Sequence, residues 1–391
     1  MKALPDIRYV RSRDVSIGYM RWGQGKHQVV FTPPLVSNVE LMWELPEWER
    51  MLEWAGQHHE IIMIDKRGVG LSDRVTEPST LDDYVLDVLA VMDAEGVESS
   101  NIVGHSEGGA IAAALAAMHP KRVRRLCLMD APALGVSQEF IRSFADPDHR
   151  PQSAGDQREM VMSLVQTWGK PESVWLEIFA PSVADDARVR RWWERFERQS
   201  CSSGSLLAMF RSMATFDLAP LLPRINAPTL VCHSLGDRVV PIIDGRAIAA
   251  LIPGAKLIEW ANADHMWSFT PNWRDAQNDI IEFLTGTRPG AGARKRIVTV
   301  LFTDIFDSTK TASELGDTEW RKVIELHDSI SRLRVSAYNG TTVKSTGDGT
   351  LAVFDEPASA VSAAIDLSRE LAASGIAIRA GLHIGQVEVQ D

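Results

Sequence analysis

Short apolar runs rich in β-branched residues alternate with longer stretches of helical period along the first 285 residues of the chain. A period of two marks a strand, and a period near 3.6 marks a helix with one buried face. Strand followed by helix, repeated several times, is typical of an α/β fold with a doubly wound, mostly parallel sheet. The runs that we predict to be strands are 28–32, 60–65, 100–105, 125–130, 229–234 and 256–260.

One long interval, residues 131–216, interrupts this alternation. It contains no convincing strand, and its segments 158–168 and 186–199 have helical period and are rich in Arg, Glu and Trp. Open α/β sheets place their ligand sites at the carboxyl ends of the strands. We therefore expect this interval to be a helical cap inserted over that edge of the sheet.

A Gly/Pro-rich linker at residues 286–295 divides the chain, and a different pattern follows it. The linker predicts one domain over residues 1–285 and a second over residues 296–391. The second domain has the order strand, helix, hairpin, helix, strand, which indicates an α+β fold. The elements that we predict there are 297–303, 309–337, 341–354, 357–373 and 376–389.

The composition is that of an ordinary globular protein, with 45% hydrophobic and 24% charged residues. The net charge of −11 argues against a nucleic-acid surface, because binding to phosphates needs clustered positive charge. The N-terminus has no apolar signal segment, and the longest small-apolar stretch, 108–118, is shorter than the roughly 20 residues of a membrane span. The three cysteines have neither metal nor disulfide spacing. We expect a cytoplasmic protein that binds no nucleic acid and no membrane.

A candidate nucleophile lies where the strand at 100–105 passes into a helix of small residues. The pentapeptide Gly104-His105-Ser106-Glu107-Gly108 has the form G-x-S-x-G of a nucleophile elbow, and it stands in the strand–turn–helix context that this motif requires. The flanking glycines allow a tight turn that exposes the Ser106 hydroxyl. The positive end of the helix dipole then faces any oxyanion that forms there.

A hydroxyl needs a base, and the base needs a group to orient it. In folds of this type these residues follow the order Ser, acid, His along the chain. His265 follows the last predicted strand of the first domain, and Asp237 follows the strand at 229–234, so both fit this order. Asp130, which also follows a strand, is an alternative acid; Asp264 is a second, but it faces away if His265 points inward.

The predicted oxyanion hole has two backbone donors. The first is the N–H of Glu107, directly after the nucleophile, and the second comes from the loop after an earlier strand, here residues 31–38. Pro33 and Pro34 have no N–H to donate. The second donor is therefore expected at Leu35 or a later residue.

With these motifs, residues 1–285 resemble the α/β-hydrolase superfamily. Besides the elbow, segment 65–72 (DKRGVGLS) resembles the D-x-R-G-x-G-x-S turn of that superfamily, as does the Gly-Asp pair that ends at Asp237. The resemblance implies a serine carboxylesterase acting on a small acyl ester, without a cofactor. The chain departs from the superfamily at Pro33-Pro34, where many members have His-Gly.

In the second domain, Asp304 ends the first predicted strand and Asp348 lies at the tip of the hairpin. Two carboxylates at adjacent strand ends can hold a pair of Mg²⁺ ions and a triphosphate. Asp307 is three residues further along and could be a helix N-cap instead.

Residues 296–391 resemble class III adenylate/guanylate cyclases, on the segments FTDIFDST, KSTGDGTLAVF and IRAGLHIGQVEV. The resemblance implies a partial ferredoxin-like α+β domain in which Asp304 and Asp348 bind Mg²⁺ or Mn²⁺. It also implies that backbone groups of Ile305 and Phe306 lie near the phosphates and that Lys344 reads the purine. Complete cyclase domains act as dimers, so a homodimer is implied as well.

The transition-state Asn and Arg of the cyclase family lie on a helix that would follow the strand ending here at Val389. We therefore expect this 391-residue chain to be a very poor cyclase with an exposed edge on its last strand. Three functions remain open: a serine esterase, an adenylate cyclase regulated by the hydrolase fold, and a sensor whose hydrolase pocket binds a small molecule without turnover. The complete Ser106–Asp237–His265 order favours the esterase over the sensor.

Overall fold

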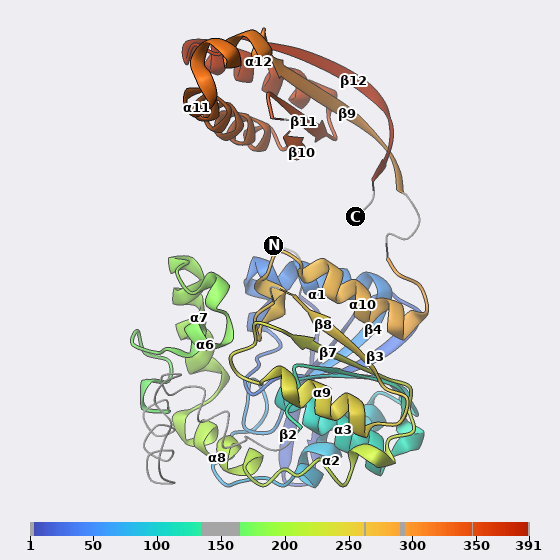
Figure 1. Ribbon diagram of the computed structural model, residues 1–391. Coiled ribbons are helices and arrows are strands. Elements are labelled where there is room, and N and C mark those ends of the chain that lie inside the picture. The colour runs from blue at the N-terminus through green and yellow to red at the C-terminus, as the bar shows by residue number, and fades with distance from the viewer. Residues whose placement is uncertain (1–3, 134–164, 262, 290–293, 346, 390–391) are drawn as a thin grey trace. The chain divides into compact units, whose positions relative to one another are not determined.

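The computed structural model describes residues 4–133, 165–261, 263–289, 294–345 and 347–389 (Figure 1). The chain forms two compact units, Met1–Arg288 and Pro289–Asp391. Each unit has its own sheet and its own hydrophobic core. Within the described residues, no helix combines the length and the hydropathy that are needed to cross a bilayer.

The first unit is built on an eight-stranded sheet in the order β1-β2-β4-β3-β5-β6-β7-β8. Strands β3 to β8 are parallel, while β1 and β2 form an antiparallel hairpin at one edge. The predicted mostly parallel sheet is confirmed, but the edge hairpin was not predicted. The strands are β1 (Ile7–Ser12), β2 (Val15–Trp22), β3 (His27–Thr32), β4 (His59–Ile64), β5 (Ser100–His105), β6 (Val123–Met129), β7 (Thr229–Ser234) and β8 (Lys256–Trp260).

Helices cover both faces of this sheet. Figure 1 shows α1 (Pro46–His58) and α10 (Trp273–Thr285) on one face, and α2 (Leu81–Ala94), α3 (Glu107–Met118) and α9 (Ile242–Leu251) on the other. Neighbouring strand residues enter different cores, as Val29 packs with the α1–α10 side and Val30 with the opposite side. Small side chains let α3 lie closely against the sheet, and nearly every residue of this helix is buried.

The described part of the predicted cap, 165–216, is helical. It contains α6 (Trp175–Phe179), α7 (Ala187–Ser200) and α8 (Ser203–Met213). Its contacts are with loops at the carboxyl ends of strands: the Met266 N–H, after β8, donates to Phe179 O (2.9 Å), and the Gly70 N–H, after β4, donates to Ser200 O (2.7 Å). The cap therefore lies against the edge where α/β sheets carry their sites. Most of the predicted helical segment 158–168 lies outside the described residues.

The second unit is an antiparallel sheet of four strands in the order β10-β11-β9-β12, with the element order β-α-β-β-α-β along the chain. Both helices pack on one face, through residues such as Leu301, Val335 and Phe354. In the described part of the chain β12 pairs only with β9. The elements are β9 (Arg294–Ile305), α11 (Ser308–Ala337), β10 (Thr341–Ser345), β11 (Gly349–Phe354), α12 (Pro357–Ala373) and β12 (Ile378–Val389).

Candidate active site

Ser106 lies on a sharp turn between β5 and α3, with φ 55° and ψ −126°. Non-glycine residues rarely adopt this backbone conformation, and it persists only where the surroundings hold it. The Ser106 N–H donates to Met129 O (2.8 Å), and the Gly109 N–H donates to Ser106 O (2.8 Å). A side chain at Gly104 would collide with the Gly108 carbonyl, and one at Gly108 would collide with the Thr32 carbonyl. Glycine is therefore required on both sides of the candidate nucleophile.

His265 and Asp237 meet in two loops that follow β8 and β7. The His265 Nδ1–H donates to Asp237 Oδ2 at 2.7 Å, and both side chains are fully buried. Asp237 is itself fixed, because its Oδ1 accepts the N–H groups of Val239 (2.6 Å) and Val240 (2.9 Å). His265 Nε2 is buried and has no hydrogen-bond partner among the residues that the structure describes. The ring is therefore held in one orientation with Nε2 left as a base.

His105, the residue before Ser106, connects the His265 loop to the nucleophile strand. Its Nε2–H donates to the His265 carbonyl oxygen at 3.0 Å, and the two rings stack with centroids 5.1 Å apart. Burial lowers the pKa of His105 to about 3, so this imidazole is neutral. The contact brings the loop of His265 to the end of β5, where Ser106 begins its turn.

The two alternative acids make other contacts. Asp130 accepts the Ser234 N–H (2.7 Å), and Asp264 accepts the Ser182 N–H (2.9 Å). Burial, together with the charge of Asp237, raises the pKa of Asp130 well above its ordinary value. Of the three candidate acids, Asp237 is the one that contacts the His265 ring.

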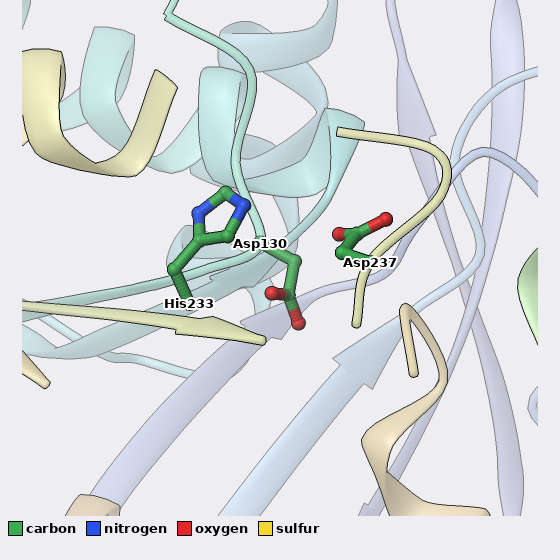
Figure 2. A group of neighbouring side chains, drawn as sticks. All are labelled: Asp130, His233 and Asp237. Atoms are coloured by element: carbon green, nitrogen blue, oxygen red, sulfur yellow. The ribbon is translucent and has the colours of Figure 1, made fainter. Parts of the chain in front are cut away.

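Within the described residues, Asp130, His233 and Asp237 form the one group of three or more potential metal ligands whose ligand atoms all lie within 4.8 Å of one another (Figure 2). Each of the three already has a protein partner. Asp237 binds His265, Asp130 binds Ser234, and the His233 Nε2–H donates to Val240 O (2.9 Å). Burial also lowers the pKa of His233. These hydrogen bonds hold the Asp237 loop against the ends of β6 and β7.

The two predicted oxyanion donors lie in segments that share a buried lysine. The Lys66 ammonium forms an ion pair with the Glu107 carboxylate and donates to the Leu35 carbonyl at 3.3 Å. Lys66 and Glu107 are 1% and 0% exposed. Burial raises the pKa of Glu107, and the Lys66 charge opposes this rise. Sequence reasoning missed Lys66, because a Lys in a polar turn is normally solvated.

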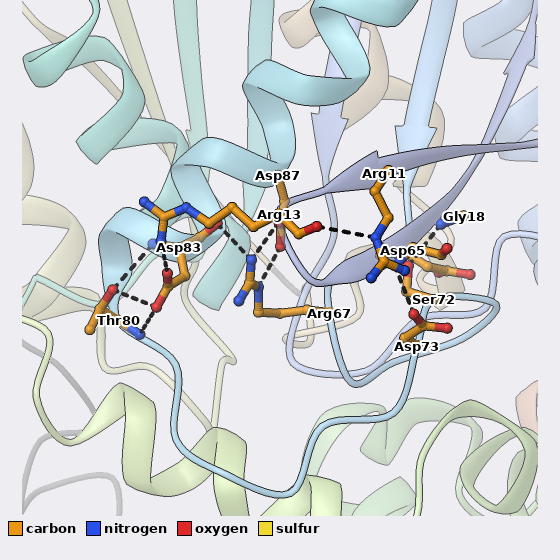
Figure 3. A network of polar contacts seen from close by, with 11 residues as sticks. Arg11, Arg13, Gly18, Asp65, Arg67, Ser72, Asp73, Thr80, Asp83 and Asp87 are labelled. Atoms are coloured by element: carbon orange, nitrogen blue, oxygen red, sulfur yellow. Dashed lines mark hydrogen bonds and ion pairs between the residues drawn. The ribbon is translucent and has the colours of Figure 1, made fainter.

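The Asp65–Ser72 turn contacts residues 33–39, here called the oxyanion loop because it carries the predicted donor Leu35. Figure 3 shows Asp65 and Ser72 of this turn beside Gly18 of β2. Asp65 accepts the Ser37 hydroxyl (2.6 Å), the Val39 N–H (3.2 Å) and the Leu71 N–H (2.9 Å). Burial raises the pKa of Asp65 to about 6. Gly70 has φ +55°, and its Cα approaches the Asp65 carboxylate so closely that no side chain fits there. The D-x-R-G-x-G-x-S motif therefore needs glycine at position 70, because the Asp65 carboxylate occupies the space of a side chain there.

Arg67 in the same turn makes a separate ion pair with Asp87 of α2, at 2.7 Å. Both side chains are almost completely buried, at 7% and 2% exposed. Figure 3 shows this pair between the capping contacts of Thr80 and Asp83 at the start of α2 and the Asp65 turn. The Arg67–Asp87 pair fixes the turn to α2. Helix α2 carries none of the candidate site residues.

A small apolar pocket of about 20 Å³ lies between the oxyanion loop and the cap. A larger apolar cavity of about 90 Å³ lies between the sheet and helices α1 and α10, and His105, Met266 and Ala55 contribute to its lining. Pro34 and Met266 border both spaces. The small pocket is lined by Pro34, Leu35, Val36, Trp168, Phe179, Trp193, Phe196 and Met266.

In the second unit, the backbone brings Asp304 and Asp348 to the same end of two paired strands. Asp304 is the cross-strand partner of Gly349, and the Ile305 N–H donates to Asp348 O (2.8 Å). The Asp304 side chain is 52% exposed and lies 3.8 Å from an Arg379 nitrogen. Lys344 is exposed on β10. Asp307 begins α11, but its side chain makes no capping hydrogen bond.

Residues 41–271 match the family described as alpha/beta hydrolase fold, which is more than half of the chain. The chain therefore belongs to the α/β-hydrolase family. This match ends before the second unit, and the comparisons give no support to the cyclase resemblance there.

Among curated relatives, the bifunctional esterase/perhydrolase of Acinetobacter calcoaceticus is 29% identical over 271 residues, covering 66% of this chain and 92% of that protein. The 2-hydroxymuconate semialdehyde hydrolase of Pseudomonas putida is 31% identical over 225 residues, covering 54% of this chain and 72% of that protein. The solved enol-lactonase from Burkholderia xenovorans is 22% identical with a TM-score of 0.57, covering 71% of this chain and all of that one. This last likeness is one of fold.

Proposed function

We propose that the first unit is a serine hydrolase that cleaves small carboxylic esters with an apolar acyl group. The observation that carries this proposal is the buried Asp237–His265 hydrogen bond of 2.7 Å, in a loop that His105 ties to the strand of Ser106. The esterase named among the relatives supports the reaction class. The apolar and aromatic lining of the pocket beside Leu35 supports an apolar acyl group.

In the proposed reaction the Ser106 Oγ attacks the ester carbonyl while His265 Nε2 takes the hydroxyl proton. Asp237 keeps the proton on Nδ1 and stabilises the imidazolium that forms. The N–H groups of Glu107 and Leu35 stabilise the oxyanion of the tetrahedral intermediate. His265 then gives its proton to the leaving alcohol, and an acyl-enzyme remains on Ser106. Water, deprotonated by the same nitrogen, releases the acid and restores the hydroxyl.

The acyl chain is proposed to extend past Met266 into the larger cavity. The pocket beside the oxyanion loop, about 20 Å³, has room for about one water molecule and not for an acyl chain. The cavity of about 90 Å³ begins on the other side of Met266 and Pro34. Because a methionine side chain is flexible, Met266 can open a path between the two spaces.

The test uses the whole chain with short p-nitrophenyl esters and a fluorophosphonate probe. Ser106→Ala is expected to abolish turnover and labelling, and peptide mapping of the wild-type adduct is expected to find Ser106. Ser203→Ala, on the exposed start of α8, is the matched control and should behave as wild type. EDTA should leave turnover unchanged. Turnover that survives in Ser106→Ala would refute the proposal, and tight ligand binding without turnover would favour the sensor function.

For the second unit we propose that Asp304 and Asp348 bind Mg²⁺ or Mn²⁺ in a cyclase-like site that includes Lys344. Their strand-end register supports this proposal, and carboxylate oxygens suit these hard cations. A bound ion would supply charge neutralisation for a triphosphate. Calorimetric titration of the chain with Mn²⁺ and ATP should show binding that Asp304→Ala removes. An unchanged titration in that variant would contradict the proposed site.

A further inference from the structure

Lys66 is a cation with almost no access to water, and the proposed reaction does not use it. Its side chain is 1% exposed, and its ammonium contacts the Glu107 carboxylate and the Leu35 carbonyl. These two residues carry the two proposed oxyanion donors. A single side chain thus connects the two segments between which the oxyanion would form.

Burial of the Lys66–Glu107 ion pair removes two charges from water, which by itself disfavours the folded state. Desolvation of two charges can exceed their mutual attraction, and apolar residues of similar volume often serve equally well. Glu107 also keeps one carboxylate oxygen buried without a hydrogen-bond partner. A buried ion pair next to Ser106 that adds little stability indicates that it positions the neighbouring backbone.

The oxyanion loop depends on outside support. Pro33 and Pro34 donate no hydrogen bonds, so this part of the loop cannot be held through its own N–H groups. Asp65 holds the far part of the loop through Ser37 and Val39. Lys66 is the neighbouring residue and holds Leu35 itself, at the end that faces the nucleophile turn.

We infer that Lys66 is a positioning residue that sets the spacing between the Leu35 and Glu107 amides of the oxyanion hole. This inference rests on the proposed function of the first unit. Lys66 touches no reacting atom: its charge is balanced by the Glu107 carboxylate, and it acts through the backbone of Leu35. Its loss should weaken binding of the transition state more than binding of the ester.

The test separates positioning from folding with three variants. Lys66→Met removes the cation, and K66M/E107M replaces the whole pair by apolar side chains while keeping the Glu107 backbone donor. Arg67→Met is the matched control, because it breaks the buried pair with Asp87, which reaches α2 and not the oxyanion loop. For each variant we would measure the melting temperature, kcat, KM and the affinity for a trifluoromethyl ketone that mimics the tetrahedral intermediate.

K66M is expected to lower kcat about 10- to 100-fold with little change in KM, the size of effect expected from a displaced donor. Ketone affinity should fall by a similar factor. K66M/E107M should regain melting temperature but not kcat, because the tie to Leu35 is still missing. Arg67→Met should lose melting temperature, and its loss of kcat and ketone affinity should be much smaller than that of K66M, because Lys66 still holds Leu35.

A stably folded K66M/E107M with wild-type kcat and ketone affinity would overturn the inference and leave the proposed function standing. Loss of kcat and ketone affinity in Arg67→Met as large as in K66M would also overturn it, since any buried pair would then have the same effect. Failure of the proposed function has a different signature, because turnover by the wild-type chain would then not depend on Ser106.

Discussion

The His105 Nε2–H donates to the carbonyl oxygen of His265 at 3.0 Å, and the two imidazole rings stack. This contact joins the strand that ends in the candidate nucleophile to the loop that carries the candidate base, which are 160 residues apart along the chain. With a pKa of about 3, His105 stays neutral at ordinary pH and keeps one nitrogen free of a proton. The contact is therefore a fixed hydrogen bond and does not titrate in the working range.

His105→Phe is expected to keep the stacking and lose the donor. The buried His265 carbonyl would then lack its partner, at a cost of about 1–3 kcal/mol in the free energy of unfolding. With the His265 loop less firmly held, kcat should fall about 10-fold at nearly constant KM. Ester kinetics and thermal unfolding check this. His119→Phe, at the far end of α3, is the control, and an unchanged kcat in His105→Phe would contradict the assigned tie.

Substitution of the two neighbouring acids should give very different effects. Asp237→Asn should lower kcat roughly 10³- to 10⁴-fold, because the Nδ1 proton and the imidazolium lose their acceptor. Asp130→Asn should stay within about 10-fold of wild type, because Asp130 binds the Ser234 N–H while the His265 ring binds Asp237. Steady-state kcat at pH 8 decides between them. The reverse order would identify Asp130 as the acid of the triad.

Local motifs explain what the sequence could predict. The elbow around Ser106 is a contiguous signal, because two glycines and a strand–helix junction must coincide within a few residues. The parallel strands were equally visible, since burial on both faces goes with a short apolar run in the middle of each, as in β5 and β7. The β1–β2 hairpin was missed because β1 is a mostly exposed edge strand that contains Arg8 and Arg11 and has no apolar run.

Features set by tertiary packing were not predictable. Lys66 and Glu107 are 41 residues apart, and each is polar, so nothing in the local pattern shows that they are buried together. The division of space between the cap pocket and the deeper cavity depends on how Met266 packs, which no periodicity encodes. The order of residues along the chain favours Asp237 over Asp130 as the acid, but only the packed structure gives the contact between Asp237 and the His265 ring.

The deeper cavity predicts a dependence on acyl length. Ala55→Leu on α1 would fill part of the roughly 90 Å³ space without touching Ser106 or His265. Acetyl ester turnover should remain within about 2-fold of wild type. For an octanoyl ester kcat/KM should fall about 10-fold, since each methylene kept out of an apolar site costs about 0.8 kcal/mol. Gln57→Leu, exposed on the same helix, is the control. Equal chain-length profiles in all three proteins would exclude the cavity as the acyl site.

Glu197 of α7 predicts a pH dependence of stability. Its buried carboxyl accepts the Gly169 N–H (2.6 Å), the Ser173 hydroxyl (3.1 Å) and the Trp193 indole N–H (2.8 Å), and burial raises its pKa to about 7 from an ordinary value of 4.5. Between these values the folded state binds a proton that the unfolded state has lost, so stability falls as the pH rises through this interval. The contribution is about 3 kcal/mol over the whole window.

Urea unfolding of the wild type and Glu197→Gln at pH 4.5, 6 and 8 measures this contribution as a change in their difference. Glutamine carries no ionisable proton, so the wild type should lose stability relative to the variant as the pH rises, whatever constant offset the lost acceptor adds. Glu172→Gln, at an exposed position in the same cap, is the matched control. A difference between wild type and Glu197→Gln that stays constant from pH 4.5 to 8 would show that this carboxyl ionises normally. Glu197 would then contribute nothing to the pH dependence of the free energy of unfolding.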